Sequence, residues 1–434
     1  MRVHLSSLGC RLNEAELEGW ARQFQAQGHN ITPHSQDADL VILNSCAVTQ
    51  AAVRKSRQQV RRIHRTNPQA KVVVSGCYAS LQPEETANLL GVDLVVANTD
   101  KHNLYQRVQE QQLITPEPGH TPTEILSDIP ETTLFARGRQ RAFVKVQDGC
   151  RHQCTFCIVT VARGAERSRP IQTIVDEINL LHQQGIYEVI LTGVHLGGYG
   201  SDLHIQLDQL IQSVLDNTDM PRIRLGSLEP WDLPDDFFGL FQNPRLMPHL
   251  HLPLQSGSAS VLRRMARRCS PDQFKQLVTQ GRQIIPDLNI TTDIIVGFPG
   301  ESEEEWQQSY SFIEAIGFGH IHIFSYSARE GTRAANLPNP VAPDIKKNRN
   351  QSLHRLAAKL KLEVFTQNLD KKFPVLWENP VTGNNGLTKL SGYTPNYLRV
   401  TYQCSKDDAP GNQIRVVHLD RIASEDDHLI AIPP

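Results

Sequence analysis

Three cysteines in one short segment constrain the fold of this chain more than any other feature. Cys150, Cys154 and Cys157 follow one another at the spacing C-x3-C-x2-C. A run of β-forming residues at 143–146 precedes them, so we expect the thiols on a loop that leaves the end of a strand. Three thiolates on one loop are able to hold a single compact metal centre.

The number of ligands bears on the type of metal centre. Structural zinc takes four protein ligands, and His152, between the first two cysteines, is a poor fourth ligand because simultaneous ligation would strain so short a turn. An iron–sulfur cube usually takes four cysteines. With three, one iron stays open for a small-molecule ligand. We favour the cube, with zinc or plain buried thiols as the alternatives.

The first 114 residues alternate apolar β-type runs with amphipathic helical patterns. The expected strands span 3–8, 40–43, 72–74 and 94–97. This alternation predicts a doubly wound parallel sheet in an α/β unit. Cys10, Cys46 and Cys77 each follow a strand, and the carboxyl ends of parallel strands share one edge of a sheet, where ligands bind. A single free cysteine is commonly just buried, but the repetition favours one shared site.

Residues 136–368 repeat the alternation on a larger scale. The expected strands span 143–146, 189–192, 223–227, 249–253, 293–297 and 320–325. Six β/α units are too few for a closed eight-fold barrel, so we predict a partial (β/α)6 barrel. The active face of such a barrel lies at the carboxyl ends of its strands. The cysteine loop directly follows the first of them.

Polar or glycine-containing turns at other strand ends supply candidate contacts to a small-molecule ligand at that face. Glycine lets the backbone approach a ligand closely, and we select Thr192, Gly193, Glu229, Gln255 and Asp293. Each of these is equally well explained as a turn residue or a helix cap. The same turns contain Ser227, Ser256 and His195. His195 is a further but weaker candidate contact, because a histidine in a loop is more often a surface residue.

Two further stretches differ in composition from these units. Residues 115–135 are rich in proline and polar residues and are typical of an interdomain linker. Residues 369–434 follow a helical segment at 352–367 and combine alternating polarity with Gly and Pro turns, which predicts a small β-barrel. Cys269 and Cys404 have no partner spacing, and we treat both as structural.

Charge and composition limit the environment and the partners. No apolar run approaches the ~18 residues of a membrane helix, and the start is not a secretory signal, so we expect a cytoplasmic protein with no membrane partner. There, the eight cysteines are expected to be reduced thiols or metal ligands. The net charge of -2 argues against a uniformly basic nucleic-acid binder.

Basic residues are nevertheless concentrated in three groups, and together with a small β-barrel they point to a phosphate-rich partner such as RNA. The groups are Arg54, Lys55, Arg57, Arg61, Arg62 and Arg65; Arg163, Arg167 and Arg169; and Arg263, Arg264, Arg267 and Arg268. For any one group alone, a solvated charged face is the simpler explanation.

The cysteine loop, with Phe156 just before its last cysteine, resembles the radical S-adenosylmethionine (SAM) superfamily. The whole chain is similar to the methylthiotransferase family within it, through the segments LGCRLNEAE, NSCAVT and SGCYA around the N-terminal cysteines. The segments KVQDGC, TGVHLGGYG and RLGSLEP resemble the branch that acts on N6-threonylcarbamoyladenosine at position 37 of tRNA. Arg11 stands where lysine is usual, and Ser45 where threonine is usual.

This resemblance implies two [4Fe–4S] clusters and SAM as cofactors. A catalytic cluster on Cys150, Cys154 and Cys157 would bind and cleave SAM, and an auxiliary cluster would use Cys10, Cys46 and Cys77. The five selected turn residues become candidate SAM contacts, and 369–434 becomes a TRAM-like RNA-binding barrel. The implied domains are 1–114 for the auxiliary cluster, 115–135 as linker, 136–368 as radical SAM core, and 369–434.

The implied reaction is methylthiolation of C2 of the modified adenosine, in the anticodon loop of tRNA, with electrons from a reductant. Two alternatives keep the chemistry and change the target: isopentenyladenosine in tRNA, or an aspartate of a ribosomal protein. A third alternative is a non-catalytic iron–sulfur RNA-binding module.

Overall fold

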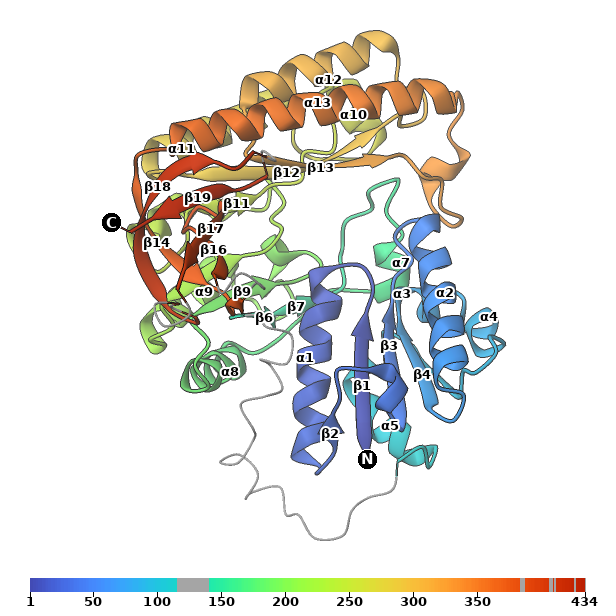
Figure 1. The fold of residues 1–434 in the computed structure, drawn as a ribbon. Helices are drawn as coiled ribbons and strands as arrows, with labels where there is room; N and C mark the ends of the chain where they lie inside the picture. Colours follow the sequence, from blue (N-terminus) through green and yellow to red (C-terminus); the bar gives the residue numbers. More distant parts are fainter. Residues whose placement is uncertain (115–139, 383–386, 406–408, 410, 425–426, 434) are drawn as a thin grey trace.

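The chain forms three successive units, which Figure 1 shows in blue, in green to orange, and in red. The computed structural model describes residues 1–114, 140–382, 387–405, 409, 411–424 and 427–433. The predicted linker at 115–135 lies outside the described residues. Among the described helices, none combines the length and the apolar composition that crossing a membrane requires.

The first unit is a parallel sheet with strand order β2-β1-β3-β4-β5. Its strands are β1 (Arg2–Ser7), β2 (Asn30–Ile31), β3 (Leu40–Ser45), β4 (Lys71–Gly76) and β5 (Leu94–Val96). Its helices are α1 (Arg11–Ala26), α2 (Gln50–Thr66), α3 (Cys77–Leu81), α4 (Pro83–Ala87) and α5 (Leu104–Glu110), with 3-10 turns η1 (Ser35–Asp37) and η2 (Lys101–Asn103).

Alternation along β3 explains why helices cover both faces of this sheet. Leu40 and Ile42 pack into the core formed with α1 and α5, whereas Val41 and Leu43 pack into the core formed with α2. Successive side chains of a strand point to opposite faces, so an uninterrupted apolar run requires cover on both sides. The predicted doubly wound sheet is confirmed. The sequence reading omitted β2, which is only two residues long.

The second unit contains six parallel strands in chain order. They are β6 (Arg141–Lys145), β9 (Glu188–Thr192), β10 (Arg222–Leu225), β11 (His249–His251), β12 (Asn289–Val296) and β13 (His320–Ser325). Two three-stranded sheets, β10-β9-β6 and β11-β12-β13, meet through parallel bridges such as Ser227 with His251. The strands therefore form the predicted partial barrel.

Helices cover the outside of this barrel. They are α8 (Ile171–Gln183), α9 (Leu207–Asn217), α10 (Ala259–Arg264), α11 (Pro271–Ile284), α12 (Glu303–Ile316) and α13 (Pro343–Gln367). The shorter elements are β7 (Gln147–Asp148), α7 (Val159–Arg163), β8 (Arg167–Ser168), η3 (Leu196–Gly198), η4 (Phe237–Gln242) and η5 (Arg333–Asn336). Helix α10 ends before the predicted Arg267 because Ala266 takes a left-handed φ of 57°. Helix α13 begins at Pro343, well before the predicted residue 352. The prediction missed its first turns because their polar residues show no apolar period.

The third unit is a closed β-barrel. Strands β14, β18, β19, β17 and β16 pair in that order, and β16 pairs again with β14. The strands are β14 (Lys372–Trp377), β15 (Val381–Thr382), β16 (Thr388–Tyr393), β17 (Arg399–Cys404), β18 (Ile414–Ile422) and β19 (Leu429–Ile432). The predicted small barrel is confirmed, and it buries Trp377 completely.

This small barrel seals the amino-terminal end of the partial barrel. Arg222, the first residue of β10, donates to the Tyr393 carbonyl at 3.0 Å. Asn289, the first residue of β12, donates to the Asn396 carbonyl at 2.9 Å. Because the cysteine loop leaves the opposite, carboxyl ends of the strands, the third unit forms a floor beneath the active face. It is not a free appendage.

The buried Asn289 bond provides a test of this floor. We expect Asn289→Ala to lower the free energy of unfolding by about 1–3 kcal/mol, because the Asn396 carbonyl would lose a buried donor. Asn179→Ala is the matched control, since Asn179 donates to the Asn217 carbonyl at 3.1 Å in a more exposed position. Thermal unfolding followed by circular dichroism measures both. Equal melting temperatures for the two variants would contradict the floor's contribution.

Candidate metal centres

The cysteine loop of the partial barrel is folded tightly on itself. Gly149 has a φ of 75°, and a Cβ there would lie 1.9 Å from the Ala165 carbonyl oxygen, so only glycine fits. The Cys150 amide donates to the Gly164 carbonyl at 3.1 Å, and the Cys157 amide donates to the Cys154 carbonyl at 3.0 Å. The three thiols are thereby brought together, each partly exposed.

These three thiols are electrostatically coupled. Burial, together with the charges of neighbouring thiolates, raises the pKa of Cys150 to about 12 and that of Cys157 to about 11. Burial also raises the pKa of Cys154, which Arg267 opposes by donating to its sulfur at 3.8 Å. Three neighbouring thiolates in a partly buried loop need a cationic centre to balance them. The donor set therefore fits a metal cluster.

The second set of thiols converges from three separate loops. Cys10 caps α1, Cys46 follows β3, and Cys77 opens α3. A Cβ on Gly9, with its φ of 100°, would lie 2.5 Å from the Cys46 sulfur, so glycine is required there. Burial, together with the charges of Cys77 and Cys10, raises the pKa of Cys46 to about 11. The structure thus places the three thiols at one sheet edge, as the strand pattern predicted.

Sulfur spacing argues for clusters over single zinc ions. In the part of the chain that the structure describes, neither set of three cysteines has all its sulfur atoms within 4.8 Å of one another. A tetrahedral zinc ion, with Zn–S distances of about 2.3 Å, needs sulfurs about 3.8 Å apart. In a cube, each ligand sits on a different iron atom, so the sulfurs stand further apart. Neither set is therefore arranged for a single zinc ion held by all three of its sulfurs.

Ser45, one of the two departures noted in the sequence, keeps the contacts a threonine hydroxyl would make. Its hydroxyl donates to the Ser75 carbonyl and accepts from the Ala79 amide. The group therefore ties β3 to β4 and to the first turn of α3, beside Cys77. Serine leaves this support intact.

Arg163 connects the two cysteine sets. It is 2% exposed at the end of α7, directly after the cysteine loop. Its guanidinium lies 3.0 Å from carboxylate oxygens of Glu16 and of Asp148, and donates to the Asn13 side chain at 2.7 Å. Burial would lower its pKa, but the two carboxylates and the thiolates of the second set raise it well above its ordinary value.

The sequence assigned Arg163 and Arg267 to RNA-facing basic groups, and for both the structure overturns this. Arg267 is 3% exposed, and its Nη2 lies 2.6 Å from Glu229. Buried guanidiniums with carboxylate partners are not available to phosphate. Their position in the sequence could have distinguished them: Arg163 ends a short helix directly after the cysteine loop, and Arg267 follows the short helix α10, so neither lies on the exposed face of a long helix.

Glu229, a candidate SAM contact, lies beside the cysteine loop. It holds Arg267, which donates to Cys154, and its own charge adds to the raised pKa of Cys150. Thr192 ends β9 and is buried. A Cβ on Gly193 would lie 2.9 Å from the Gln147 side-chain oxygen, so the glycine makes room for a neighbouring side chain.

Gln255 and Asp293 lie on the second half of the barrel. Gln255 has a φ of 73°, and its amide donates to the Asp293 carbonyl at 2.8 Å. Asp293 was predicted to begin its strand, but it lies in the middle of β12, with its carboxylate 3.3 Å from His251. The predicted boundary is wrong because β-branched Thr291 and Thr292 extend the strand backward. SAM contact by all five selected residues stays a prediction.

A buried histidine pair behind the cysteine loop was not anticipated. The Nε2 atoms of His152 and His195 lie 3.0 Å apart, and each lies 2.7 Å from Asp232 Oδ2. His195 Nδ1 lies 2.5 Å from Glu166. His195 is 1% exposed, so it is not the surface residue that its place in a loop suggested. Burial would lower the pKa of His195, but hydrogen bonds to the two carboxylates raise it above its ordinary value. This network braces the loop between Cys150 and Cys154.

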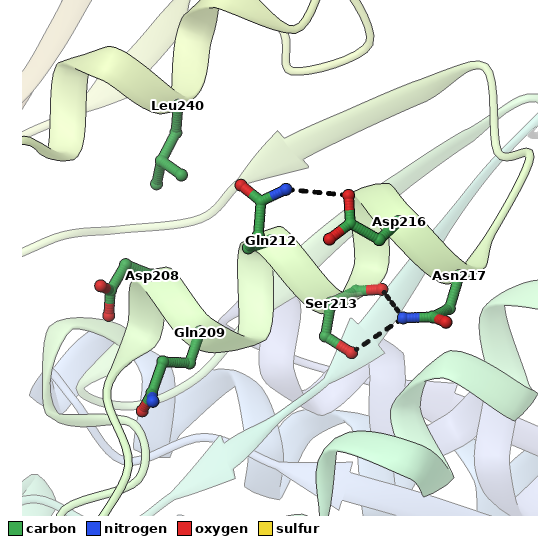
Figure 2. A pocket seen from close by; sticks show the side chains of 7 residues that line it. All are labelled: Asp208, Gln209, Gln212, Ser213, Asp216, Asn217 and Leu240. Carbon is green, nitrogen blue, oxygen red and sulfur yellow. Dashed lines mark hydrogen bonds between the residues drawn. The ribbon is translucent and has the colours of Figure 1, made fainter.

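A separate hollow of about 490 Å³ lies along the outer side of α9. Figure 2 shows that polar side chains of α9, including Asp208 and Asp216, line it together with Leu240. None of the six cysteines lines this hollow, and its two carboxylates repel anionic ligands. We assign it no part in the site.

Comparison with known proteins places this geometry in a family. The chain matches a family described as uncharacterized protein family UPF0004 over residues 2–97 and the radical SAM superfamily over residues 144–313. It resembles the solved structure of the radical SAM methyltransferase TsrM from Kitasatospora setae, with cobalamin and a [4Fe-4S] cluster bound. The TM-score is 0.56 at 14% identity, over 77% of each chain. That likeness shows the fold alone.

Sequence relatives extend over nearly the whole chain. Threonylcarbamoyladenosine tRNA methylthiotransferase MtaB of Bacillus subtilis is 34% identical over 93% of this chain and 91% of its own length. A tRNA-2-methylthio-N(6)-dimethylallyladenosine synthase of Akkermansia muciniphila is 31% identical over 94% of each. Membership at this level implies SAM and [4Fe–4S] clusters as cofactors. The chain therefore belongs to the radical-SAM methylthiotransferase family of enzymes.

Proposed function

We propose that this enzyme adds a methylthio group to C2 of N6-threonylcarbamoyladenosine at position 37 of tRNA. The observation that carries the proposal is the pair of three-cysteine sets, formed by separate loops and joined through Arg163. A methylthio transfer to an unreactive C–H position needs a sulfur donor and a radical source side by side. The MtaB relative of Bacillus subtilis, whose name states methylthio transfer to threonylcarbamoyladenosine of tRNA, supports the choice of substrate.

Cys150, Cys154 and Cys157 would hold the cluster that binds SAM, and Cys10, Cys46 and Cys77 the auxiliary cluster. When bound, these groups supply the radical chemistry and the sulfur that a side-chain base cannot provide, because adenine C2 carries no acidic proton. The role of the polypeptide is to fix the two sets of ligands relative to each other and to admit the base between them.

Three side chains hold the two sets in place. Arg163 fastens α7 to Asn13 in the first turn of α1, immediately after Cys10. Asn98 donates to the Ala162 carbonyl at 2.7 Å and to the Cys77 sulfur at 3.8 Å, and so joins the other end of the auxiliary set to α7. Arg267 supports Cys154 from the opposite side. Figure 1 shows α3 next to α7 at this junction.

Helix α2 supports the assignment of RNA as the substrate. Arg54, Lys55, Arg61, Arg62 and Arg65 are exposed on it. In the described part of the chain, no carboxylate lies within 4.0 Å of any of these five groups. Among the arginines and lysines of α2, Arg57 is the one that forms an ion pair there, with Glu85. Unpaired cations on one helix fit the phosphates of a folded RNA. We infer that the anticodon stem lies along α2 while the loop enters the partial barrel.

The second candidate is methylthiolation of isopentenyl-type adenosine, which the Akkermansia muciniphila relative names. The lower identity of that relative and the branch-specific segments favour the threonylcarbamoyl form. A protein reductant and a cytoplasmic setting complete the proposal, because the reaction consumes electrons and tRNA is its substrate.

The first prediction tests both ligand sets. Anaerobically reconstituted enzyme is expected to hold about eight iron atoms, from two cubes. Replacing Cys150, Cys154 and Cys157 by Ala should leave about four and abolish SAM cleavage. Replacing Cys10, Cys46 and Cys77 by Ala should also leave about four but retain SAM cleavage. Iron analysis and chromatography of 5′-deoxyadenosine measure these outcomes. Full iron content in the second variant would refute the auxiliary site. As a control, the double variant Cys269→Ala, Cys404→Ala should lose no iron.

The second prediction concerns the base. The enzyme should methylthiolate tRNA that carries N6-threonylcarbamoyladenosine and leave tRNA with plain or isopentenyl adenosine nearly unchanged. Mass spectrometry of nucleosides after a side-by-side reaction measures this. Faster turnover of the isopentenyl form would move the protein to the second candidate without changing its chemistry.

The third prediction concerns α2. Changing Arg61, Arg62 and Arg65 to Gln should weaken tRNA binding at least tenfold in low salt and flatten its salt dependence, because fewer counterions are released. The control changes three exposed cations of α13, Lys347, Arg355 and Lys359, to Gln. The two variants have the same net charge. Equal losses of affinity would show that overall charge, and not the α2 surface, governs binding.

A further inference from the structure

The inner wall of the partial barrel carries an open polar surface. On β13, Ile321 packs into the core beneath the outer helices, so alternation turns His320, His322 and Phe324 toward the inside. All three are exposed, Phe324 by 45%. Exposed side chains on the inner face of a barrel strand mark a space that solvent, and therefore a substrate, enters.

Neighbouring strands add hydrogen-bonding groups to this wall. His251 of β11, Asp293 of β12 and His322 have ligand atoms within 4.8 Å of one another, and His251 lies 3.3 Å from the Asp293 carboxylate. Partial desolvation by the surrounding strands, together with the charges of His251 and Arg11, lowers the pKa of His322 although its side chain is still open to solvent. A neutral imidazole offers one donor and one acceptor. The wall is therefore suited to a polar, uncharged part of a ligand.

Arg11 faces this wall from the first unit. Its guanidinium lies 5.4 Å from the Phe143 ring centroid of β6 and 6.0 Å from that of Tyr397 in the floor. The positive charge of Arg11 also contributes to the lowered pKa of His322. The guanidinium therefore lies where all three units meet, one residue after Cys10.

Arg11 has no anionic partner within the described residues. It is exposed, and no carboxylate there lies within 4.0 Å of it. Balancing the auxiliary thiols does not explain it, because Arg163 is the cation that lowers the pKa of Cys46. Nor does a solvated surface, since two aromatic rings from different units flank it. The guanidinium is therefore available to bind an anion from outside the chain.

We propose that Arg11 binds the free α-carboxylate of the threonylcarbamoyl substituent and so selects adenosines that carry an anionic amino-acid group. The inference rests on the proposed function and assigns its specificity to one side chain. An α-carboxyl group, with an ordinary pKa of about 3.3–3.7, is fully ionised at neutral pH. The guanidinium fork matches a carboxylate with two parallel hydrogen bonds. An isopentenyl group offers no charge and would leave the arginine unpaired.

The position of Arg11 also explains how selection serves the reaction. The guanidinium lies beside Phe143 and Tyr397, so an anchored carboxylate would hold the substituent where the three units meet, against the inner wall. His322 and Asp293 are then within the same space for the hydroxyl and N–H groups of the substituent. A substrate without the carboxylate loses the anchor even where its adenine is accepted.

The test pairs a change in the enzyme with a change in the RNA. An anticodon stem-loop bearing threonylcarbamoyladenosine is compared with the same RNA whose threonine carboxylate is a neutral methyl ester. Binding is measured by fluorescence anisotropy with the reconstituted enzyme, without reductant. The wild type should bind the free acid about tenfold or more tightly, as a charge-assisted pair provides. Arg11→Gln should bind both RNAs alike, and Arg11→Lys should keep most of the preference.

Controls separate this inference from the proposed function. Arg2→Gln removes an exposed arginine at the other end of the first sheet, 3.0 Å from Asp39, and should bind like the wild type. Iron content should be unchanged in all variants. Retained preference in Arg11→Gln, or no preference in the wild type, overturns the role of Arg11 even if threonylcarbamoyladenosine is methylthiolated. If the enzyme methylthiolates tRNA with isopentenyl adenosine and does not methylthiolate tRNA with threonylcarbamoyladenosine, the proposed function itself is wrong.

Discussion

The buried ion network around Arg163 fixes the geometry on which the whole site depends. Glu16 pairs with Arg163 of α7 after the cysteine loop, with Lys101 of η2 after the first sheet, and with Lys145 of barrel strand β6. Burial would raise the pKa of Glu16, but these cations hold it well below its ordinary value. Removing one member of such a network strands a buried charge at a cost of about 3–5 kcal/mol. The two cysteine sets therefore hold a fixed relation through charge pairing rather than through covalent linkage or a continuous sheet.

The same junction shows why three units are needed for one chamber. Helix α1 packs on the inner side of the barrel through Ala15, Phe143 and Ile190, the small barrel closes the floor, and the cysteine loop lies at the carboxyl ends of the strands. An open six-stranded barrel has unpaired edges and an uncovered interior. Here the first and third units supply that cover and leave polar residues of β11 to β13 exposed inside. The side chains that reach the chamber thus come from positions nearly 400 residues apart in the sequence, Arg11 and Tyr397 among them.

Burial and ion pairing also distinguish the charged residues that position the cysteine loops from those available to bind RNA. Arg163, Arg267 and His195 are enclosed and each is satisfied by carboxylates, so their role is to position the loops that bear the thiols. Arg11 and five of the cations of α2, all except Arg57, are exposed without such partners in the described chain. An unpaired surface cation is free to bind an incoming anion. Whether a cation is ion-paired therefore separates the residues that build the site from those proposed to contact RNA.

The sequence alone determined most of the elements and which cysteines come together. Strand and helix periods are local, so the doubly wound sheet, the six-unit partial barrel and the small barrel followed from pattern, and cysteines at strand ends converge by topology. What only the tertiary structure decided was which charges meet. Arg163 and Arg267 looked like RNA contacts and His195 like a surface residue, because their carboxylate partners lie far away in the sequence. The start of β12 was missed because its burial comes from packing against other elements, and the first turns of α13 were missed because they are polar and mostly exposed. Pairing and burial are properties of the assembled fold, and no local pattern encodes them.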